Sequence, residues 1–362
     1  MKMKTIGILG SAGAIGKNVV ELLRNTYQVK AAYHRNIPQK QAEVIYQQVD
    51  VEDKQQVADF IKDCAIVINC AGASYLHGET VAGLVAEQNG IYIDPFGADY
   101  LAEKLKGQFQ GTFILSCGCF PGMTGIMQKS VITELEKTEE IQGCNVDRHV
   151  PSLYGIIDFI LSGVNGFGVS GNCYENGEEK KDSANSYLKD MDGYEFRAAK
   201  YYTTELRQLV EKYQPYSAIW YTPVLNGVLT EKMQKAIWSY MKDKSIDVLK
   251  KSAREICDYV KKNQSNQTDC QIMISAIGQK NGKTVEKKLQ LRTDNSSVVS
   301  AAVITAMVLY LENHNLEQGS YYGTELLTLK DVENVLMKQG IRFINMEKEV
   351  EEEEDDYEEG YF

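Results

Sequence analysis

The feature that most constrains this chain is a glycine-rich turn between an apolar segment, 5–9, and an amphipathic segment, 17–24, near the amino terminus. In the order strand, G-x-x-G-x-x-G turn, helix, the glycines turn the chain tightly, bring its backbone close to a pyrophosphate and pack helix on strand. The free N–H groups at the helix amino terminus bind the anion. We therefore predict that the turn binds a dinucleotide. Its residues are Gly10, Ser11, Ala12, Gly13, Ala14, Ile15 and Gly16.

The residues after the next expected strand, 29–33, indicate which dinucleotide is bound. A site for NAD places an Asp or Glu here, where its carboxylate accepts hydrogen bonds from the ribose hydroxyls. This chain has His34 and Arg35 instead. A cation suits a 2′-phosphate, so we predict NADP(H) as the cofactor and NAD(H) as the less favoured alternative. The other interpretation of Arg35 is a solvated loop residue.

Strands and helices alternate through the first third of the chain. We expect strands at 43–49, 65–69, 91–93 and 112–116, separated by helices at 54–62, 78–89 and 98–106. This alternation predicts an α/β fold with a Rossmann-type, doubly wound parallel sheet. Ligands of such sheets lie beyond the carboxyl ends of the strands. Besides the glycine turn, the residues expected there are His34, Arg35, Asp50, Val51, Cys70, Ala71, Gly72, Asp94, Pro121 and Gly122.

Several short motifs resemble the saccharopine dehydrogenase-like family of NAD(P)-dependent oxidoreductases. In addition to the glycine turn, they are Asn69-Cys70-Ala71-Gly72, Tyr92-Ile93-Asp94 and Gly118-Cys119-Phe120-Pro121-Gly122. A further match lies at 319–326, which looks like the closing segment of the family with Tyr-Gly-Thr-Glu in place of the common Pro-Pro-Glu. The resemblance is good over the first 125 residues, moderate after about 296, and slight between them.

The resemblance implies that the chain leaves a Rossmann domain (1–125), builds a second α/β domain (126–295) and returns with its last helices (296–345). The sequence between permits an antiparallel sheet. Strands are expected at 144–150, 271–278 and 285–291, with a hairpin at Asn281-Gly282. Helices are expected at 154–162, 231–241, 246–262 and 298–311, and a long loop at 165–191. We also expect a homodimer formed through the second domain.

The family acts chiefly on secondary amines and imines derived from amino acids. The reaction that the resemblance implies is therefore reduction of an imine, or the reverse oxidation of an amine, on a small-molecule substrate. A nicotinamide enzyme has to place the substrate carbon near the ring, polarise its double bond and supply a proton. The family resemblance covers the cofactor residues better than the residues that perform these steps.

Three residues are candidates for the proton transfer. Asp94 ends a strand on the ligand side, although an Asp before a Pro is as often a turn cap. Cys119, with Cys117, flanks the nicotinamide position that the resemblance implies, but small buried packing residues are the more common interpretation. His149 shares one face of an expected strand with Asp147, and its proton is labile near neutral pH; a lone strand histidine is more often a surface residue.

The sequence leaves the substrate open. A dicarboxylate needs arginines that grip both of its ends. The available arginines are Arg148, Arg197, Arg207 and Arg292, and no spacing pairs any two of them. The 22 tyrosines, clustered at 201–202, 213–221 and 321–322, are suited to an aromatic pocket for a bulkier substrate, although ordinary half-buried packing explains them equally.

Two other functions remain open on the sequence alone. One is reduction of an activated C=C bond in specialised metabolism, since some relatives in the broad family have such a role. The other is a non-catalytic regulator or scaffold that binds NADP(H) while its second domain serves a partner. The acidic terminus and the weak match in the middle of the chain favour the second of these.

The net charge of −11 belongs mostly to the terminus. Residues 347–362 hold ten acids and one base, so the rest of the chain is nearly neutral. Nucleic-acid binding needs clustered positive charge and is not expected. We interpret 346–362 as an acidic tail that is solvated or binds a partner, and we expect the fold to survive its removal.

Other features limit the class of protein. No apolar run reaches the 18 to 20 residues of a membrane span, and the start of the chain has no signal-peptide pattern, so we expect a cytoplasmic protein without membrane contact. The eight cysteines are dispersed, with no C-x-x-C pair and only four histidines. Reduced thiols, and no bound metal, are therefore expected.

Overall fold

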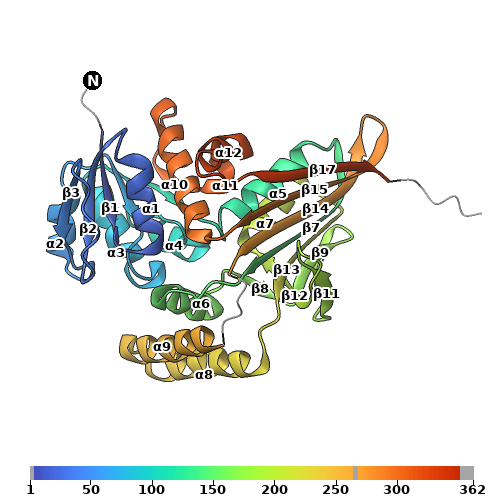
Figure 1. The fold of residues 1–362 in the computed structure, drawn as a ribbon, viewed down its shortest axis with the longest axis horizontal. Coiled ribbons are helices and arrows are strands. Elements are labelled where there is room, and N and C mark those ends of the chain that lie inside the picture. Colours follow the sequence, from blue (N-terminus) through green and yellow to red (C-terminus); the bar gives the residue numbers. More distant parts are fainter. Residues whose placement is uncertain (1–3, 264–267, 351–362) are drawn as a thin grey trace, which may run out of the picture.

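The computed structural model describes residues 4–263 and 268–350. Two sheets organise the chain, each with its own layer of helices. In Figure 1 the sheet built from the amino-terminal part lies on the left, and a second, longer sheet extends to the right. Helices from three separate parts of the sequence lie between and below them. Elements of the second domain therefore approach the ligand edge of the first sheet.

The first sheet has seven strands, all parallel, in the order β16-β6-β5-β4-β1-β2-β3. The strands are β1 (Thr5–Leu9), β2 (Gln28–Tyr33), β3 (Val44–Gln48), β4 (Ile66–Asn69), β5 (Ile91–Ile93), β6 (Thr112–Leu115) and β16 (Gly319–Tyr322). The order reverses between β1 and β4, which is the topological switch point where doubly wound sheets bind ligands. The predicted Rossmann-type fold is confirmed. The closing segment adds β16, a strand that the sequence did not predict.

Helices cover both faces of this sheet, so its strands alternate between two hydrophobic cores. In β4, Ile66 and Ile68 point into one core and Val67 into the other. The first face carries α1 (Ala14–Leu23), α10 (Ser296–Asn313) and α12 (Leu329–Met337); the second carries α2 (Lys54–Ile61), α3 (Ser74–Glu87) and α4 (Ala98–Leu105). Among the described residues, α10 is long and apolar enough to cross a membrane, and 67% of it is buried inside the protein.

The second sheet is mixed, because β13 runs parallel to β7 while the other neighbours are antiparallel. Its main path is β10-β9-β13-β7-β14-β15-β17, and β8, β11 and β12 join at β13. The strands are β7 (Lys137–Asp147), β8 (Gly168–Ser170), β9 (Asn172–Glu175), β10 (Glu178–Lys181), β11 (Ser186–Lys189), β12 (Glu195–Thr203), β13 (Ser217–Pro223), β14 (Cys270–Lys280), β15 (Lys283–Thr293) and β17 (Phe343–Glu349). The hairpin predicted at Asn281-Gly282 joins β14 to β15, with both residues at positive φ.

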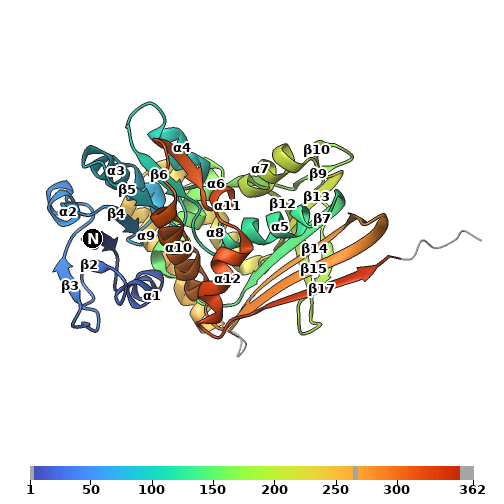
Figure 2. The same cartoon turned by 90° about the horizontal axis from the view of Figure 1, so that it is seen from above.

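The helices of the second domain form two groups. The helices α5 (Met123–Thr133) and α7 (Thr204–Tyr213) pack on the second sheet. The helices α6 (Leu153–Asn165), α8 (Gly227–Asp243) and α9 (Ile246–Lys262) form a separate layer with its own core, which includes Ala73 and Tyr75 of the first domain. This layer lies below the first sheet in Figure 1 and behind α10 in the view of Figure 2. A short helix, α11 (Gly323–Leu326), follows β16 on the return.

The expectation of a long loop at 165–191 is wrong. This segment contains β8, β9, β10 and β11, which are strands of three or four residues. They are too short for a period of two to stand out, and most of their side chains are partly or fully exposed, so apolar alternation is weak. The one usable signal is Asn176-Gly177, a two-residue turn with both φ angles positive between β9 and β10.

A buried carboxylate from the second domain fixes the point where the chain leaves the first domain. Glu205, at the start of α7, accepts hydrogen bonds from the Gly122 N–H (2.7 Å), the Thr124 hydroxyl (2.7 Å) and the Thr324 hydroxyl (3.1 Å). Glu205 thereby pairs with a free N–H group at the amino terminus of α5, where Gly122 offers no side-chain cap. Its bond to Thr324 also holds α11 against α5. Burial raises the pKa of Glu205, and the three donors oppose that rise.

The start of the acidic segment is a strand rather than a solvated tail. In β17, Glu347 bonds to Lys280 (2.7 Å) and to Lys287 (2.9 Å), and Glu349 bonds to Lys283 (2.6 Å). The side chain of Lys287 is only 3% exposed, so the carboxylate of Glu347 compensates a buried charge. The expectation that everything from 347 onward is dispensable for folding therefore does not fit this edge of the sheet.

Two truncations test this difference. A chain that ends at Val350 keeps every contact of β17 and is expected to unfold at the wild-type temperature. A chain that ends at Arg342 leaves Lys287 with one carboxylate fewer and bares the β15 edge. We expect its thermal midpoint to fall by several degrees, because about 2 kcal/mol shifts a domain of this size by about 4–8 °C. Equal midpoints by calorimetry would contradict the structural role of β17.

Candidate functional site

The glycine turn between β1 and α1 is tightly packed at its first and third glycines. Gly10 has φ of +76°, and a Cβ there would lie 2.4 Å from the Cys70 carbonyl oxygen. A Cβ on Gly16 would lie 2.3 Å from the Gly10 carbonyl oxygen. Both positions therefore exclude any side chain because of the protein's own backbone.

The middle glycine is different, because the protein alone does not fill the space beside it. Gly13 is exposed, and the nearest neighbour of a Cβ at this position would be the Gly10 carbonyl oxygen, at 3.2 Å. Gly13 is also the N-cap of α1, where no side chain accepts from the free N–H groups. Ser11 does not compete for this position, since its hydroxyl donates to the Ala32 carbonyl at 2.8 Å. An anion that approaches the backbone closely fits both observations.

The carboxyl ends of β2 and β3 bring together two of the predicted cofactor residues. His34 Nε2 lies 3.5 Å from Asp50 Oδ2, and both side chains are partly exposed. Arg35 is exposed beside them and makes no ion pair within the described part of the chain. Val51 follows Asp50 in the turn before α2 and is half-buried. The predicted cations and the carboxylate thus lie at one edge, open to a ligand.

Asp94 is fully buried at the end of β5, where four donors surround its carboxylate. The hydroxyls of Tyr92 (2.5 Å) and Ser74 (2.7 Å) and the N–H of Phe96 (2.8 Å) donate to it. The amide of Asn69 contacts it at 3.5 Å and also donates to the Tyr92 hydroxyl. Burial raises the pKa of Asp94, and these hydrogen bonds oppose the rise. The carboxylate of Asp94 is thus enclosed by hydrogen-bond donors of this chain.

A second carboxyl group, which the sequence did not suggest, lies next to this group. Asp158 of α6 accepts from the backbone N–H groups of Ser74 and Tyr75, each at 3.2 Å. It therefore caps α3, whose N-cap Ala73 has no side-chain acceptor. Burial raises the pKa of Asp158 to about 8, and the nearby charge of Asp94 adds to the rise. Ser74 connects the two carboxyls, since its hydroxyl donates to Asp94 and its N–H to Asp158.

The turn after β6 brings Cys117 and Cys119 into the protein interior. Both thiols belong to the large hydrophobic core, and the Cys119 N–H donates to the Ser300 hydroxyl of α10 at 3.0 Å. Burial raises the pKa of Cys117, with a smaller contribution from Asp94. Pro121 and Gly122 lie in this turn, and Gly118 and Gly122 form a backbone bridge. The packing interpretation of these cysteines thus has direct geometric support.

His149 lies two residues beyond the end of β7, in the connection to α6, so the expectation that it shares a strand face with Asp147 is wrong. Its Nδ1 lies 2.6 Å from Asp147 Oδ1, and its Nε2 contacts the Asp294 carbonyl at the end of β15. Burial lowers the pKa of His149, but the Asp147 carboxylate and the Asp294 carbonyl more than offset this, so the pKa lies above 6.5. None of these partners belongs to the group around Asp94. The structure thus does not bring His149 and Asp94 together.

The other catalytic expectations concern the arginines and tyrosines. Arg148 pairs with Asp190 and Asp269, and Arg292 pairs with Asp192 and Asp269, so both cations are committed to carboxylates of this chain. Aromatic rings form a chain of neighbouring contacts from the start of α3 into the second domain, with centroids 4.6–6.2 Å apart. The rings belong to Tyr75, Phe96, Tyr100, Phe120, Phe167, Tyr201 and Trp220.

Comparisons with known proteins agree with this architecture. A model of the NAD dependent epimerase/dehydratase family matches residues 6–90, which span β1 to α3. Apo saccharopine dehydrogenase (L-Glu forming) from Saccharomyces cerevisiae superposes with a TM-score of 0.67 over 96% of this chain and 100% of that chain, at 13% identity. No sequence among curated proteins matches.

Two further structures have lower TM-scores. DAP dehydrogenase of C. glutamicum, in complex with DAP, has a TM-score of 0.48 and 12% identity over 90% of this chain and 95% of that chain. A short-chain dehydrogenase/reductase from Veillonella parvula in complex with NADP covers 25% of this chain and 46% of that chain, with a TM-score of 0.23 and 16% identity. The yeast enzyme is similar over the whole chain, so the resemblance indicated by the motifs is confirmed at the level of the fold.

Among the described residues, no group of three or more His, Cys, Asp or Glu side chains is arranged to hold a metal ion. The site residues that the sequence did not indicate are those whose hydrogen-bond partners lie far away in the sequence. Ser74 and Asp158 are 84 positions apart, and Gly122 and Glu205 are 83 apart. The one local signal is the Ser74-Tyr75 pair directly after the Asn69–Gly72 motif.

Substitutions in the glycine turn separate binding from folding. Gly13→Val is expected to abolish NADPH binding while the thermal midpoint stays close to wild type, because the new side chain points into the ligand's space. Gly16→Val is expected to destabilise the protein even without cofactor, since its Cβ meets backbone atoms. Fluorescence titration and thermal unfolding measure the two effects. Retained affinity in a folded Gly13→Val protein would mean that the phosphates bind elsewhere.

Proposed function

We propose that this protein is an NADP(H)-dependent oxidoreductase that reduces an imine derived from an amino acid or a 2-oxo acid, or oxidises the corresponding amine. The observation that carries the proposal is the uncapped amino terminus of α1, at the switch point of the sheet, with an exposed Gly13. The fold shared with saccharopine dehydrogenase supports the reaction class. The exposed His34 and Arg35 support NADP(H) over NAD(H).

Each part of the site has a distinct task in this proposal. Residues 10–16 bind the pyrophosphate, and Arg35 and His34 bind the 2′-phosphate. The cofactor, when bound, supplies a hydride. Asp94 keeps Ser74 and the turn after β5 in place through its hydrogen bonds. Asp158 is the proton donor: in reduction its carboxyl proton goes to the substrate nitrogen as the carbon gains the hydride, and the carboxylate is then reprotonated from solvent.

The surroundings of Asp158 favour an imine with an apolar or aromatic substituent. Tyr75, which follows Ser74, stacks on Tyr100 with centroids 4.6 Å apart, and its hydroxyl is buried without a partner in the described structure. Arg148 and Arg292 are already paired with carboxylates, so they are not available to hold a second substrate carboxylate. We therefore expect a substrate that presents no second carboxylate to these two arginines.

Two other functions would give different results in assays of the purified protein. Reduction of an activated C=C bond needs the same hydride and a proton delivered to carbon, so the product of a turnover assay distinguishes it. A non-catalytic NADP(H)-binding regulator predicts binding without turnover. A cytoplasmic homodimer formed through the second domain is proposed as well, and light scattering of the purified protein tests the dimer.

The test of the proposed function is a titration with NADPH and NADH followed by turnover assays. We expect tighter binding of NADPH, and oxidation of NADPH when 2-oxo acids are mixed with amines that carry apolar side chains. Arg35→Asp is expected to shift the preference toward NADH. Failure of the wild-type protein to bind either dinucleotide would refute the proposal, and binding without any turnover would favour the regulator.

The assigned role of Asp158 predicts a pH dependence. Reduction needs the protonated carboxyl, so kcat is expected to fall as the pH rises through about 8, the pKa of this group. Asp158→Asn is expected to lower kcat about 100-fold or more and to remove this fall. Steady-state rates between about pH 6 and 10 measure both effects. A variant that loses activity but keeps the same pH profile would assign Asp158 a purely structural role.

A further inference from the structure

The helix α9 of the second domain reaches the turn after β3, at the ligand edge of the first domain. Lys250, in the first half of α9, lies with its Nζ 3.4 Å from Glu52 Oε1. Glu52 belongs to the turn after β3, and its N–H donates to Asp50 Oδ1 at 3.0 Å. Asp50 in turn contacts His34 at the end of β2. Lys250 is 198 residues from Glu52 in the sequence, yet it lies beside the charged groups at the ends of β2 and β3.

The same lysine also acts on the turn after β4. His77 of α3 is buried, which lowers its pKa; Glu52 and Asp50 oppose this effect, and Lys250 adds to it. The ring of His77 packs against Gly72, where a Cβ would lie 3.0 Å from the ring carbon. Lys250 therefore lies within electrostatic reach of both the β3 and the β4 turns. In doubly wound sheets the adenosine half of a dinucleotide binds at these strand ends.

A phosphorylated adenosine would need a cation beside it here, because the neighbouring side chains carry negative charge. Asp50 and Glu52 place two carboxylates at an edge where the ligand also carries negative charge. The ion pair between Lys250 and Glu52 is long, and the Glu52 side chain is 52% exposed, so the pair is weak and easily exchanged. The Lys250 side chain is 24% exposed, so it is partly accessible to solvent.

We propose that Lys250 is a cofactor-binding residue contributed by the second domain, which binds the phosphate-bearing adenosine half of the dinucleotide and offsets Asp50 and Glu52. This inference rests on the proposed function, since it concerns the same cofactor. It adds a binding residue far outside the Rossmann motifs and makes α9 the outer wall of the adenosine site.

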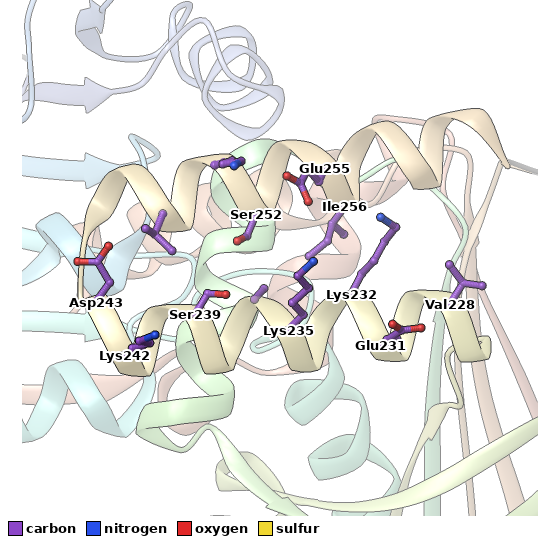
Figure 3. Close-up of a pocket in the computed structure, with 13 residues that line it drawn as sticks. Val228, Glu231, Lys232, Lys235, Ser239, Lys242, Asp243, Ser252, Glu255 and Ile256 are labelled. Carbon is purple, nitrogen blue, oxygen red and sulfur yellow. The ribbon is translucent and has the colours of Figure 1, made fainter.

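The neighbouring residue supplies a matched control. Lys251 lines a groove of about 700 Å³ between α8 and α9, together with Lys235, Lys242 and Ser252. Figure 3 shows that this groove lies between the two helices. Glu52, Asp50 and His77 do not line it. Lys250 and Lys251 therefore have the same charge and the same helix but different surroundings.

The experiment compares dissociation constants of the full-length protein, Lys250→Gln, Lys251→Gln and Glu52→Gln. The probes are NADPH, NADH and adenosine 2′,5′-bisphosphate. Lys250→Gln is expected to weaken NADPH and the bisphosphate about fivefold or more, and NADH less, because NADH lacks the 2′-phosphate. Glu52→Gln is expected to tighten NADPH, and Lys251→Gln to stay within about twofold of wild type. The loss in Lys250→Gln should shrink in about 0.5 M salt.

The outcomes separate this inference from the proposed function. Normal NADPH affinity in Lys250→Gln, or an equal loss in Lys251→Gln, would overturn the role of Lys250 and leave the Rossmann site intact. A wild-type protein that binds neither dinucleotide nor the bisphosphate would refute both. Thermal unfolding of each variant checks its folding.

Discussion

The buried carboxylate of Asp94 is the interaction on which the candidate site depends. A carboxylate without water is stable only when donors surround it. Asp94 obtains them from the end of β4, the start of α3 and the turn after β5. Through Ser74 it is connected to Asp158, so the geometry of the first sheet's ligand edge is transmitted to α6 of the second domain. The site is therefore built jointly by the two domains.

Glu205 likewise brings distant segments together, at the point where the chain leaves the first domain. It satisfies the amino terminus of α5 directly after the turn that leaves β6, and it also holds Thr324 of the returning segment. Both carboxylates are buried, and backbone N–H groups, hydroxyls and one amide stabilise them. Removing either would leave several interior donors unpaired, which costs more than the net value of the bonds themselves. These two residues explain how distant segments meet at one edge.

The sequence predicts the parts of this arrangement that are local. The turn at 10–16, the alternation of strands and helices, and the Asn281-Gly282 hairpin each depend on neighbouring residues, and the structure has each of them. Asp94 stands out in the sequence because it ends an expected strand. The sequence does not indicate that its side chain is buried.

The remaining parts depend on contacts between distant segments. Asp158, Glu205 and Lys250 have partners 83 to 198 positions away, so no spacing in the sequence indicates them. The short polar strands within 165–191 were missed for a different reason, because exposed strands of three or four residues have no apolar period.

We expect a dinucleotide to bind along the carboxyl edge of the first sheet, from the glycine turn to the Asp94 group. Hydrogen–deuterium exchange of the full-length protein, with and without saturating NADPH, measures this. Bound NADPH should slow exchange in segments 11–17, 34–36, 50–53 and 70–76, which come from four separate strand ends. Protection that spares these segments, or that is confined to the second sheet, would contradict it.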